Sequence, residues 1–369
     1  MGAETTESEV GWQTTRVKIL VAMSGGVDSS VAAALLVEQG HEVVGATLKL
    51  WGGSSDSGCC SVKDVDDARR VAQQLGLAHH VFNYTEEFER LVVDPFVAGY
   101  AKGHSPNPCI ECNRHVKFDL LIERAKRLGF DALATGHHAR VESRHGRASL
   151  VRGADPQKDQ SYVLGYLQES QLEMLHLPIG HLTKAQVRDE AARLGMRTWD
   201  KPDSQDVCFI ESSKGREHFL AERIALTPAT FVDVSSGEVV GATDAAELVT
   251  VGQRRGVVPA RNGERRFVQR VDLATNRVFV GRLDDVVVTT LELDEESMTF
   301  AREPLADGTR VVAQWSAHGI AKPATLRRGA RWWLELDAPA RPVAQGQSVV
   351  FYRFEEPDLV EGAALVVRR

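Results

Sequence analysis

The feature that most constrains the fold is the run Ser24-Gly25-Gly26-Val27-Asp28-Ser29-Ser30, which separates an apolar stretch from a helical pattern. The apolar residues 17–23 predict a buried strand, and residues 31–36 begin a helix that Gly40 should end. Because Gly25 and Gly26 lack Cβ atoms, the backbone can turn tightly there and bring its N–H groups close to an anion. The helix start adds unpaired N–H donors and the positive end of its dipole. This stretch therefore predicts a phosphate-binding turn.

Two observations limit what this turn can be. Two glycines alone would also fit an ordinary strand-to-helix turn, but Asp28 and the three serines favour a binding role. The chain lacks the Gly-x-x-x-x-Gly-Lys-Ser/Thr pattern, so the turn is not a P-loop for transfer of a γ-phosphate.

The first half of the chain alternates strand and helix patterns. Strands are expected over residues 17–23, 43–48, 80–82 and 132–135, and helices over 29–39, 63–75, 86–101 and 114–128. Gly40, Gly76 and Gly129 follow three of these helices, where a left-handed residue is common. Such alternation predicts an α/β fold with a parallel, doubly wound sheet whose ligands bind at the carboxyl ends of the strands. Thr183-Lys184-Ala185-Gln186 predicts a capping box at the start of one more helix.

The sequence pattern changes in the second half of the chain, from about residue 227. Short β-type runs separated by Gly, Asp, Asn and Pro predict a small mixed module followed by a β-barrel-like module. These runs are residues 249–251, 266–271, 277–280, 286–291, 310–314, 332–336 and 348–354.

Composition excludes several classes of protein. Apolar residues make up 43% of the 369 residues and no apolar run approaches the ~20 residues of a membrane span, so we expect no membrane partner. The acidic, polar residues 1–11 do not resemble a signal peptide, which favours a cytoplasmic protein with a frayed N-terminus. The net charge of −7 argues against a sequence-blind DNA coat.

Five cysteines are an odd number in a chain expected to be cytoplasmic, so reactive thiols or metal ligands are more plausible than disulfides. Cys109-Ile-Glu-Cys112 precedes a predicted helix, so Cys112 should lie at its N-terminus, where the dipole favours the thiolate. No second CxxC completes a zinc site. The choices left are redox or nucleophilic chemistry with Cys208, or an iron–sulfur site of Cys109, Cys112 and Cys208.

Other cysteines and polar motifs are weaker signals. Cys208 lies in the polar loop 200–209, which argues against a buried, inert thiol, whereas Cys59-Cys60 is interpreted as structural. Gly136-His137-His138 follows a predicted strand, next to the expected nucleotide site. Residues 158–162 are rich in hydrogen-bonding groups, which also fits a simple helix cap. Eight arginines against Glu264 and Asp272 in residues 250–282 suggest a phosphate-contacting surface for RNA.

Taken together, these motifs resemble the tRNA-specific 2-thiouridylase family over nearly the whole chain, from about residue 17 to the C-terminus. The residues that carry the resemblance are 22–30 (AMSGGVDSS), 107–113 (NPCIECN), 134–137 (ATGH), 158–162 (KDQSY), 203–209 (DSQDVCF), 252–256 (GQRRG) and 346–348 (GQS). The first motif alone marks only the wider group of ATP-pyrophosphatases, whereas the two cysteine motifs and GQRRG are specific.

The resemblance implies a PP-loop ATPase domain at residues 15–212 after an extension at 1–14, a small central tRNA-binding domain at 213–285 and the barrel-like domain at 286–369. The implied reaction replaces the C2 oxygen of the wobble uridine in tRNA with sulfur, after adenylation by ATP. Asp28 would lie near Mg²⁺. The implied ATP contacts are Ala22, Met23, Ser24, Gly25, Gly26, Val27, Asp28, Ser29, Leu48 and Gly136.

For sulfur transfer, the resemblance implies that Cys208 carries a persulfide received from a cysteine desulfurase or a sulfur carrier protein. Cys112 would then attack it and form a transient disulfide with Cys208. The implied contacts with the target base and the tRNA are Asn107, Pro108, Cys109, His137, Lys158, Asp159, Gln160, Gln314, Trp315 and Gln347.

The chain departs from the family's pattern at two places. Many members have aspartate at the position of Cys109, and many have Arg-Tyr-Arg at Gln314-Trp315-Ser316. A third thiol at position 109 keeps open a sulfur transferase with a 4Fe-4S cluster on Cys109, Cys112 and Cys208. Two further hypotheses are weaker. Another ATP-pyrophosphatase acting on a small molecule leaves the basic second half and the cysteine motifs without a role, and an RNA-binding module with a structural metal leaves the phosphate-binding turn unused.

Overall fold

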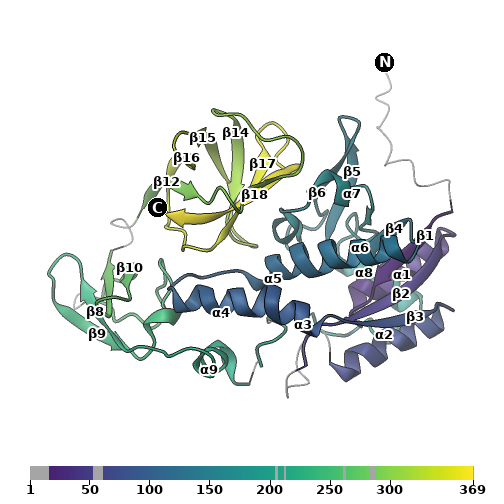
Figure 1. Cartoon of the computed structure of the whole chain (residues 1–369), viewed down its shortest axis with the longest axis horizontal. Coiled ribbons are helices and arrows are strands. Elements are labelled where there is room, and N and C mark those ends of the chain that lie inside the picture. Colours follow the sequence, from purple (N-terminus) through teal and green to yellow (C-terminus); the bar gives the residue numbers. More distant parts are fainter. Residues whose placement is uncertain are drawn as a thin grey trace. The chain divides into compact units, whose positions relative to one another are not determined.

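The structure of the chain is a computed structural model that describes residues 16–52, 61–203, 207–211, 213–260, 263–282 and 287–368. The chain packs as two compact units (Figure 1). The first comprises residues up to Phe88, together with Cys112–Phe209 and Asp358–Val360. The second comprises Glu89–Glu111, Ile210–Pro357 and the residues from Glu361 onward.

The first unit is built on a parallel sheet with the strand order β3-β2-β1-β4-β7. Its strands are β1 (Lys18–Ala22), β2 (Glu42–Lys49), β3 (His79–Asn83), β4 (Ala132–Thr135) and β7 (Leu175–His176). The predicted α/β class and the predicted strands are thereby confirmed. The two-residue edge strand β7 and the antiparallel hairpin of β5 (Ala139–Arg144) and β6 (Arg147–Arg152) were not predicted.

Helices α1 (Val27–Glu38), α2 (Val62–Gln74) and α8 (Lys184–Arg193) share one apolar core with the sheet. Ile19 and Val21 of β1 belong to this core, and both are fully buried. Leu20 points to the other face of the sheet because side chains alternate along a strand, and it is buried too. On β4, α6 (Leu121–Arg127) packs alongside.

The helix ends follow the local signals in the sequence. Gly40, Gly76 and Gly129 have φ values of 85°, 70° and 73°, which confirms their predicted left-handed conformation. The capping box is also confirmed: the Gln186 backbone N–H donates to Thr183 Oγ1, and the Thr183 N–H donates to the Gln186 side chain. Within the first unit lie the short segments α3 (Thr85–Phe88), η3 (Ser161–Leu164) and α7 (Glu169–Leu172).

The helix that carries the CxxC motif begins earlier than predicted. Consecutive helical segments α5 (Pro108–Glu111), η2 (Cys112–Leu120, a π-helix) and α6 replace a helix starting at residue 114. Cys109 therefore lies in the first turn, and Cys112 lies one turn further in. The Asn107 side chain accepts the Cys109 N–H at 3.1 Å, and proline suits the first helical position, so Asn107-Pro108 was an overlooked helix start.

The second unit contains a four-stranded mixed sheet and a closed β-barrel. η1 (Glu89–Val93), α4 (Asp94–Ala101) and α9 (Gly215–Ala221) precede the sheet of β8 (Ala229–Asp233), β9 (Val239–Thr243), β10 (Phe267–Asp272) and β11 (Arg277–Gly281). Its order is β10-β11-β8-β9, with β11 parallel to β8. The expected strand at residues 249–251 is wrong: the 3-10 turn η4 (Ala246–Leu248) ends there, and Val249 packs into the core of this sheet.

The barrel is confirmed by its strand pairing. Its strands run β12-β16-β15-β14-β17-β18, and β18 pairs back with β12, which closes the sheet; β13 pairs with β18 outside this ring. The bounds are β12 (Val288–Leu293), β13 (Thr299–Phe300), β14 (Arg310–Gln314), β15 (Lys322–Arg328), β16 (Trp332–Ala340), β17 (Ser348–Arg353) and β18 (Val360–Arg368). In the parts of the chain described, no helix is long and apolar enough to span a bilayer.

Candidate functional site

The predicted phosphate-binding turn lies between the end of β1 and the start of α1. Gly25 has a φ of 72°, which side chains rarely adopt, and α1 begins directly after Gly26. Ser29 Oγ accepts the backbone N–H of Ser24 at 3.2 Å, and Ser30 Oγ donates to the Gly26 carbonyl at 2.8 Å. These hydroxyls therefore stabilise the conformation of the turn from within.

The other implied ATP contacts surround this turn. Met23, Val27 and Leu48 are buried. The Met23 backbone pairs with β2, donating to the Ala46 carbonyl at 2.8 Å and accepting from Thr47 Oγ1 at 2.7 Å. The structure thus brings the implied ATP set together at the carboxyl ends of β1, β2 and β4.

Gly136 is required where β4 meets the start of α1. A Cβ atom there would lie 2.5 Å from the Ser29 nitrogen and 2.6 Å from the Asp28 carbonyl carbon. Both are backbone atoms, so neither can move aside as a side-chain tip could. Gly136 therefore sets how closely the strand end approaches the turn.

We expect Gly136→Ala to lower the free energy of unfolding by about 1–3 kcal/mol, the usual cost of forcing a methyl group into a packed site. Denaturant unfolding of the full chain measures it. Gly52→Ala is the matched control, because a Cβ there meets its nearest neighbour at an ordinary 3.4 Å. Equal stability of the two variants would show that the approach is not closely packed.

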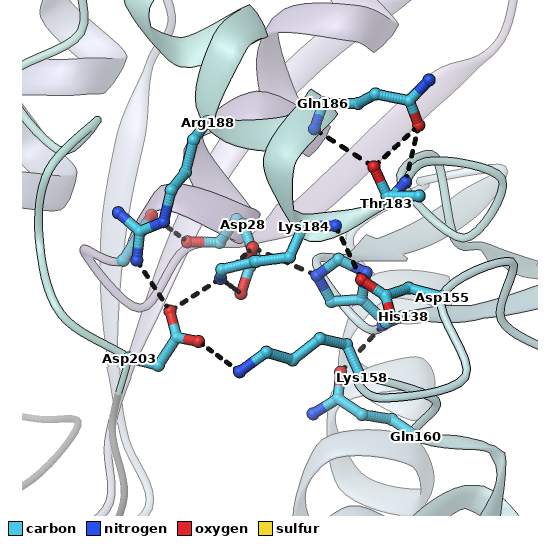
Figure 2. Close-up of polar contacts among 12 residues, drawn as sticks. Asp28, His138, Asp155, Lys158, Gln160, Thr183, Lys184, Gln186, Arg188 and Asp203 are labelled. Atoms are coloured by element: carbon cyan, nitrogen blue, oxygen red, sulfur yellow. Dashed lines mark hydrogen bonds and ion pairs between the residues drawn. The ribbon is translucent and has the colours of Figure 1, made fainter.

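A network of ion pairs extends from the turn (Figure 2). Lys184, the first residue of α8, donates to both oxygens of Asp28 at 2.7 and 2.8 Å and lies 2.8 Å from Asp203. Asp203 is also contacted by Lys158 at 2.8 Å and Arg188 at 3.2 Å. Figure 2 shows Lys184 lying between the two carboxylates. This network joins the phosphate-binding turn to the loop that leads to Cys208.

Electrostatics keep both carboxylates charged. Burial alone would raise the pKa of Asp203, but hydrogen bonds and charges from Lys158 and Lys184 lower it to about 2. Burial also opposes ionisation of Asp28, and contacts with His138 and Lys184 outweigh it, so its pKa lies below the usual value.

This pKa predicts an acid-dependent loss of stability. Because the folded-state pKa of Asp203 is about 2 against an ordinary 3.8, its contribution is complete above pH 3.8 and disappears as the pH falls toward 2. The stability difference between the wild type and Asp203→Asn should therefore shrink as the pH falls below 4. Denaturant midpoints measured from pH 6 to pH 2.5 test this. A difference independent of pH would contradict it.

The two histidines after β4 have different surroundings. His137 is buried, contacts Thr135 Oγ1 at 2.7 Å and packs against the Phe118 ring. Burial lowers its pKa well below the ordinary value, so it is neutral. His138 Nε2 lies 3.3 Å from Asp28, while Gln160 accepts its backbone N–H and donates to its carbonyl, both at 2.8 Å.

Asp159 acts locally. Its carboxylate accepts from Ser161 Oγ and from the backbone N–H groups of Gly153 and Ser161, and it pairs with Arg152 at 2.8 Å. It therefore stabilises the connection between β6 and η3, whose N-cap residue, Gln160, makes no side-chain cap hydrogen bond. Lys158, 38% exposed, extends from the same connection to Asp203.

The cysteines differ in exposure: Cys109 is exposed, Cys112 is buried and Cys208 is intermediate. Cys112 and Cys208 belong to the first unit. Phe209, next to Cys208, is buried against Phe88 and Trp51. The Cys59-Cys60 pair lies outside the described residues. Within those residues, no three or more His, Cys, Asp or Glu side chains are grouped so that they could hold a metal ion.

The implied tRNA contacts in the second unit are partly built into the barrel. Gln314 is buried and donates to the carbonyls of Ser316 and Ala317, so it shapes the loop after β14. Trp315 packs against the barrel core. Gln347 is half-buried, and its carbonyl accepts the Val366 N–H at 2.8 Å.

The arginine-rich run also divides into two kinds. Arg266 pairs with Asp233 at 2.6 Å and donates to the Pro259 carbonyl, and Arg270 lies over the Phe279 ring, so both have roles in the fold. Arg254 and Arg255 are exposed at the tip of a tight turn. Arg261 lies outside the described residues.

The sequence did not single out Lys184, Arg188 or Lys201 as site residues, and gave Asp203 and His138 no role of their own. Lys184 was noticed only as part of a capping box. A signal was present: a cap places the next residue at the N-terminus of α8, and that helix follows a strand of the parallel sheet.

The fold and the site define an α/β protein of the nucleotide-binding HUP class. Residues 17–212 match the family described as tRNA methyl transferase HUP domain, and residues 217–282 match the one described as tRNA methyl transferase PRC-barrel domain.

The particular family follows from curated relatives. The tRNA-specific 2-thiouridylase MnmA of Acidothermus cellulolyticus is 44% identical over 91% of this chain and 94% of its own length. The protein of the same name from Mycobacterium leprae is 44% identical over 95% of this chain and 99% of its own. The chain belongs to the tRNA-specific 2-thiouridylase family. A solved 4-thiouridine synthetase–RNA complex with bound ATP is similar over 50% of this chain and 43% of its own, at 18% identity and a TM-score of 0.36.

Proposed function

We propose that this enzyme replaces the C2 oxygen of the wobble uridine in tRNA anticodons with sulfur, using ATP to adenylate the carbonyl and a cysteine persulfide as sulfur source. The observation that carries the proposal is the ionic connection between the phosphate-binding turn and the Cys208 loop. An adenylation site and a sulfur-carrying thiol must act on the oxygen and the carbon of the same carbonyl group, and this connection holds Asp203, five residues before Cys208, against the turn.

ATP fits the turn between β1 and α1. The start of α1 and the glycine turn supply backbone donors for pyrophosphate, and Lys184 adds a positive charge beside them. A carbonyl oxygen is a poor leaving group, so adenylation lets it depart as AMP.

Mg²⁺ belongs to the proposal as the counter-ion of ATP. Both Asp28 oxygens are already within 2.8 Å of the Lys184 ammonium. The residues present therefore do not form a metal site around Asp28, and no step is assigned to a metal there. An iron–sulfur cluster is likewise not proposed.

For sulfur transfer, the terminal sulfur of a Cys208 persulfide attacks C2 and displaces AMP. The Cys112 thiolate then attacks the Cys208 sulfur, which releases 2-thiouridine and leaves a Cys112–Cys208 disulfide. An external thiol reductant restores both thiols. A cysteine desulfurase or a sulfur carrier protein would supply the persulfide.

The remaining assignments are also proposals. The domain boundaries at 15–212, 213–285 and 286–369 agree in outline with the two family matches. The tRNA would contact Asn107–Cys109 and the exposed Arg254 and Arg255, and the reaction would take place in the cytoplasm. The target base must leave its stack to react, as in other enzymes that modify bases.

One assay tests the function. The protein, with tRNA, ATP and a sulfide or persulfide source, should release AMP and pyrophosphate only when tRNA is present, and mass spectrometry of digested tRNA should show 2-thiouridine. ADP as the product would rule out adenylation. Methylated tRNA formed without ATP cleavage would instead support a methyl transferase activity, as the names of the two matching families suggest.

A further inference from the structure

The Lys201 ammonium is surrounded by three oxygens, called the cage below, where the phosphate-binding turn meets the first turn of α2. It donates to the Gly25 carbonyl at 2.9 Å, to Asp64 at 2.7 Å and to Asp67 at 2.9 Å. An ammonium has three N–H donors, and each has an acceptor here. Opposing effects set its charge: burial lowers its pKa, and the two aspartates raise it further, so Lys201 stays protonated.

The wall of the cage is the first turn of α2. Ser61 caps this helix, and Asp64 also accepts from the Ser61 hydroxyl at 2.6 Å. Gly25 packs directly on this turn, because a Cβ at Gly25 would lie 2.2 Å from the Asp64 carbonyl oxygen. The phosphate-binding turn is thus held against α2 by close backbone contact and by Lys201.

The contact with the Gly25 carbonyl has a directional consequence. In a planar trans peptide the carbonyl and the following N–H point in opposite directions. A donor that holds the Gly25 carbonyl toward α2 therefore directs the Gly26 N–H away from α2. Gly26 is the N-cap of α1, where backbone donors would meet a phosphate.

Lys201 also belongs to the loop that leads to Cys208. Arg188 holds this loop by its backbone, donating to the Trp199 carbonyl at 2.8 Å and to the Lys201 carbonyl at 3.1 Å. Two residues later, Asp203 contacts Lys184, and Phe209 is buried on the far side of Cys208. Lys201 and Asp203 are therefore held against the nucleotide turn, and Phe209, which follows Cys208 in the chain, is held in the apolar core.

We propose that Lys201 is a positioning residue that couples nucleotide binding at the Gly25–Gly26 peptide to the placement of Cys208. The biological role given to this coupling rests on the proposed function, whereas the experiment that tests it does not require tRNA thiolation. A nucleotide that draws on the Gly26 N–H rotates or fixes the Gly25–Gly26 peptide, and Lys201 carries that change into the loop. The cysteine that delivers sulfur thereby responds to whether ATP is present.

The test compares full-length wild type with Lys201→Met, which keeps side-chain length but loses the ammonium. The rate of Cys208 alkylation by iodoacetamide is followed by peptide mass spectrometry, without ATP and with saturating Mg²⁺-ATP. Calorimetry gives the ATP dissociation constant. Lys214→Met is the matched control, because Lys214 is an exposed lysine that pairs with Glu211, three residues away in the chain.

In the wild type and in Lys214→Met, ATP is expected to change the Cys208 alkylation rate severalfold. In Lys201→Met, that ATP-dependent ratio should fall to one even at saturation. The ATP dissociation constant should rise severalfold, because the Gly25–Gly26 peptide is no longer held in its orientation before ATP binds. A wild-type rate that does not respond to ATP, or a Lys201→Met ratio equal to the wild type, would overturn the coupling.

If Lys201→Met does not fold, Lys201→Arg decides in its place. It keeps the charge beside Asp64 and Asp67, but a planar guanidinium cannot direct donors to all three oxygens from one nitrogen. Its ATP-dependent ratio should therefore be reduced, and an unchanged ratio would overturn the coupling. None of these readouts uses tRNA, so failure of tRNA thiolation in the wild type would contradict the proposed function separately.

Discussion

Cys208→Ser should abolish persulfide-dependent thiolation while leaving tRNA-dependent release of pyrophosphate. A serine hydroxyl cannot carry a persulfide, whereas adenylation uses the turn between β1 and α1 and needs no thiol. Serine is close in size to cysteine, and position 208 is only partly buried, so the fold should survive. Pyrophosphate release and 2-thiouridine content, measured on the same reaction, separate the two steps.

Two further variants complete this test. Cys112→Ser should also stop turnover with a persulfide donor, since Cys112 must release the product sulfur. Cys109→Ser is the control: its exposed side chain has no step in the two-cysteine mechanism, so measurable activity should remain. Normal turnover of Cys208→Ser or of Cys112→Ser would eliminate the relay. Loss of activity in Cys109→Ser, with an absorption spectrum of iron–sulfur type in anaerobic wild type, would revive the cluster.

The phosphate-binding turn and the capping box were predictable because their determinants are local. Gly25 must adopt a positive φ, and Thr183 and Gln186 exchange hydrogen bonds within one helical turn. The alternation of apolar strand patterns with helix patterns was likewise sufficient to predict the parallel sheet. The family resemblance, which depends on several short motifs in a fixed order, was confirmed over most of the chain.

The ionic network was not predictable because its members meet only in the folded chain. Lys184 contacts an aspartate 156 residues away, and Lys201 contacts a carbonyl 176 residues away. The early helix start at Pro108 was missed for a different reason: the helix was expected to begin at residue 114, whereas Asn107-Pro108 is a normal helix start. Burial of Cys112 follows from that shift, since it moves the residue one turn into the helix.

The second large effect is expected for Lys184→Met, which should mainly impair the use of ATP. The substitution leaves Asp28 and Asp203 charged and facing the same space, where incoming phosphates would add negative charge. Removing one preorganised electrostatic contact commonly costs about 10²–10³ in rate, and we expect a loss of that order in kcat/KM for ATP. The pKa values of both carboxylates should rise, since Lys184 lowers each.

Lys158→Met is the matched control, because Lys158 contacts Asp203 but not Asp28 and is more exposed. Its ATP kinetics should change much less, and any defect should fall on the KM for tRNA. An unchanged KM for ATP in Lys184→Met would contradict the role of Lys184 at the turn.

Stability and catalysis can be separated at this site with a second substitution. Lys184→Met removes the ammonium that Asp28 and Asp203 share, although Asp203 keeps Lys158 and Arg188 and Asp28 keeps His138. We therefore expect a loss of about 1–3 kcal/mol in the free energy of unfolding. Adding Asp203→Asn removes one of the opposed charges and should recover part of that loss. It should not recover ATP turnover, because the ammonium beside Asp28 is still missing. Recovery of turnover in the double variant would mean that Lys184 serves the fold and not the nucleotide.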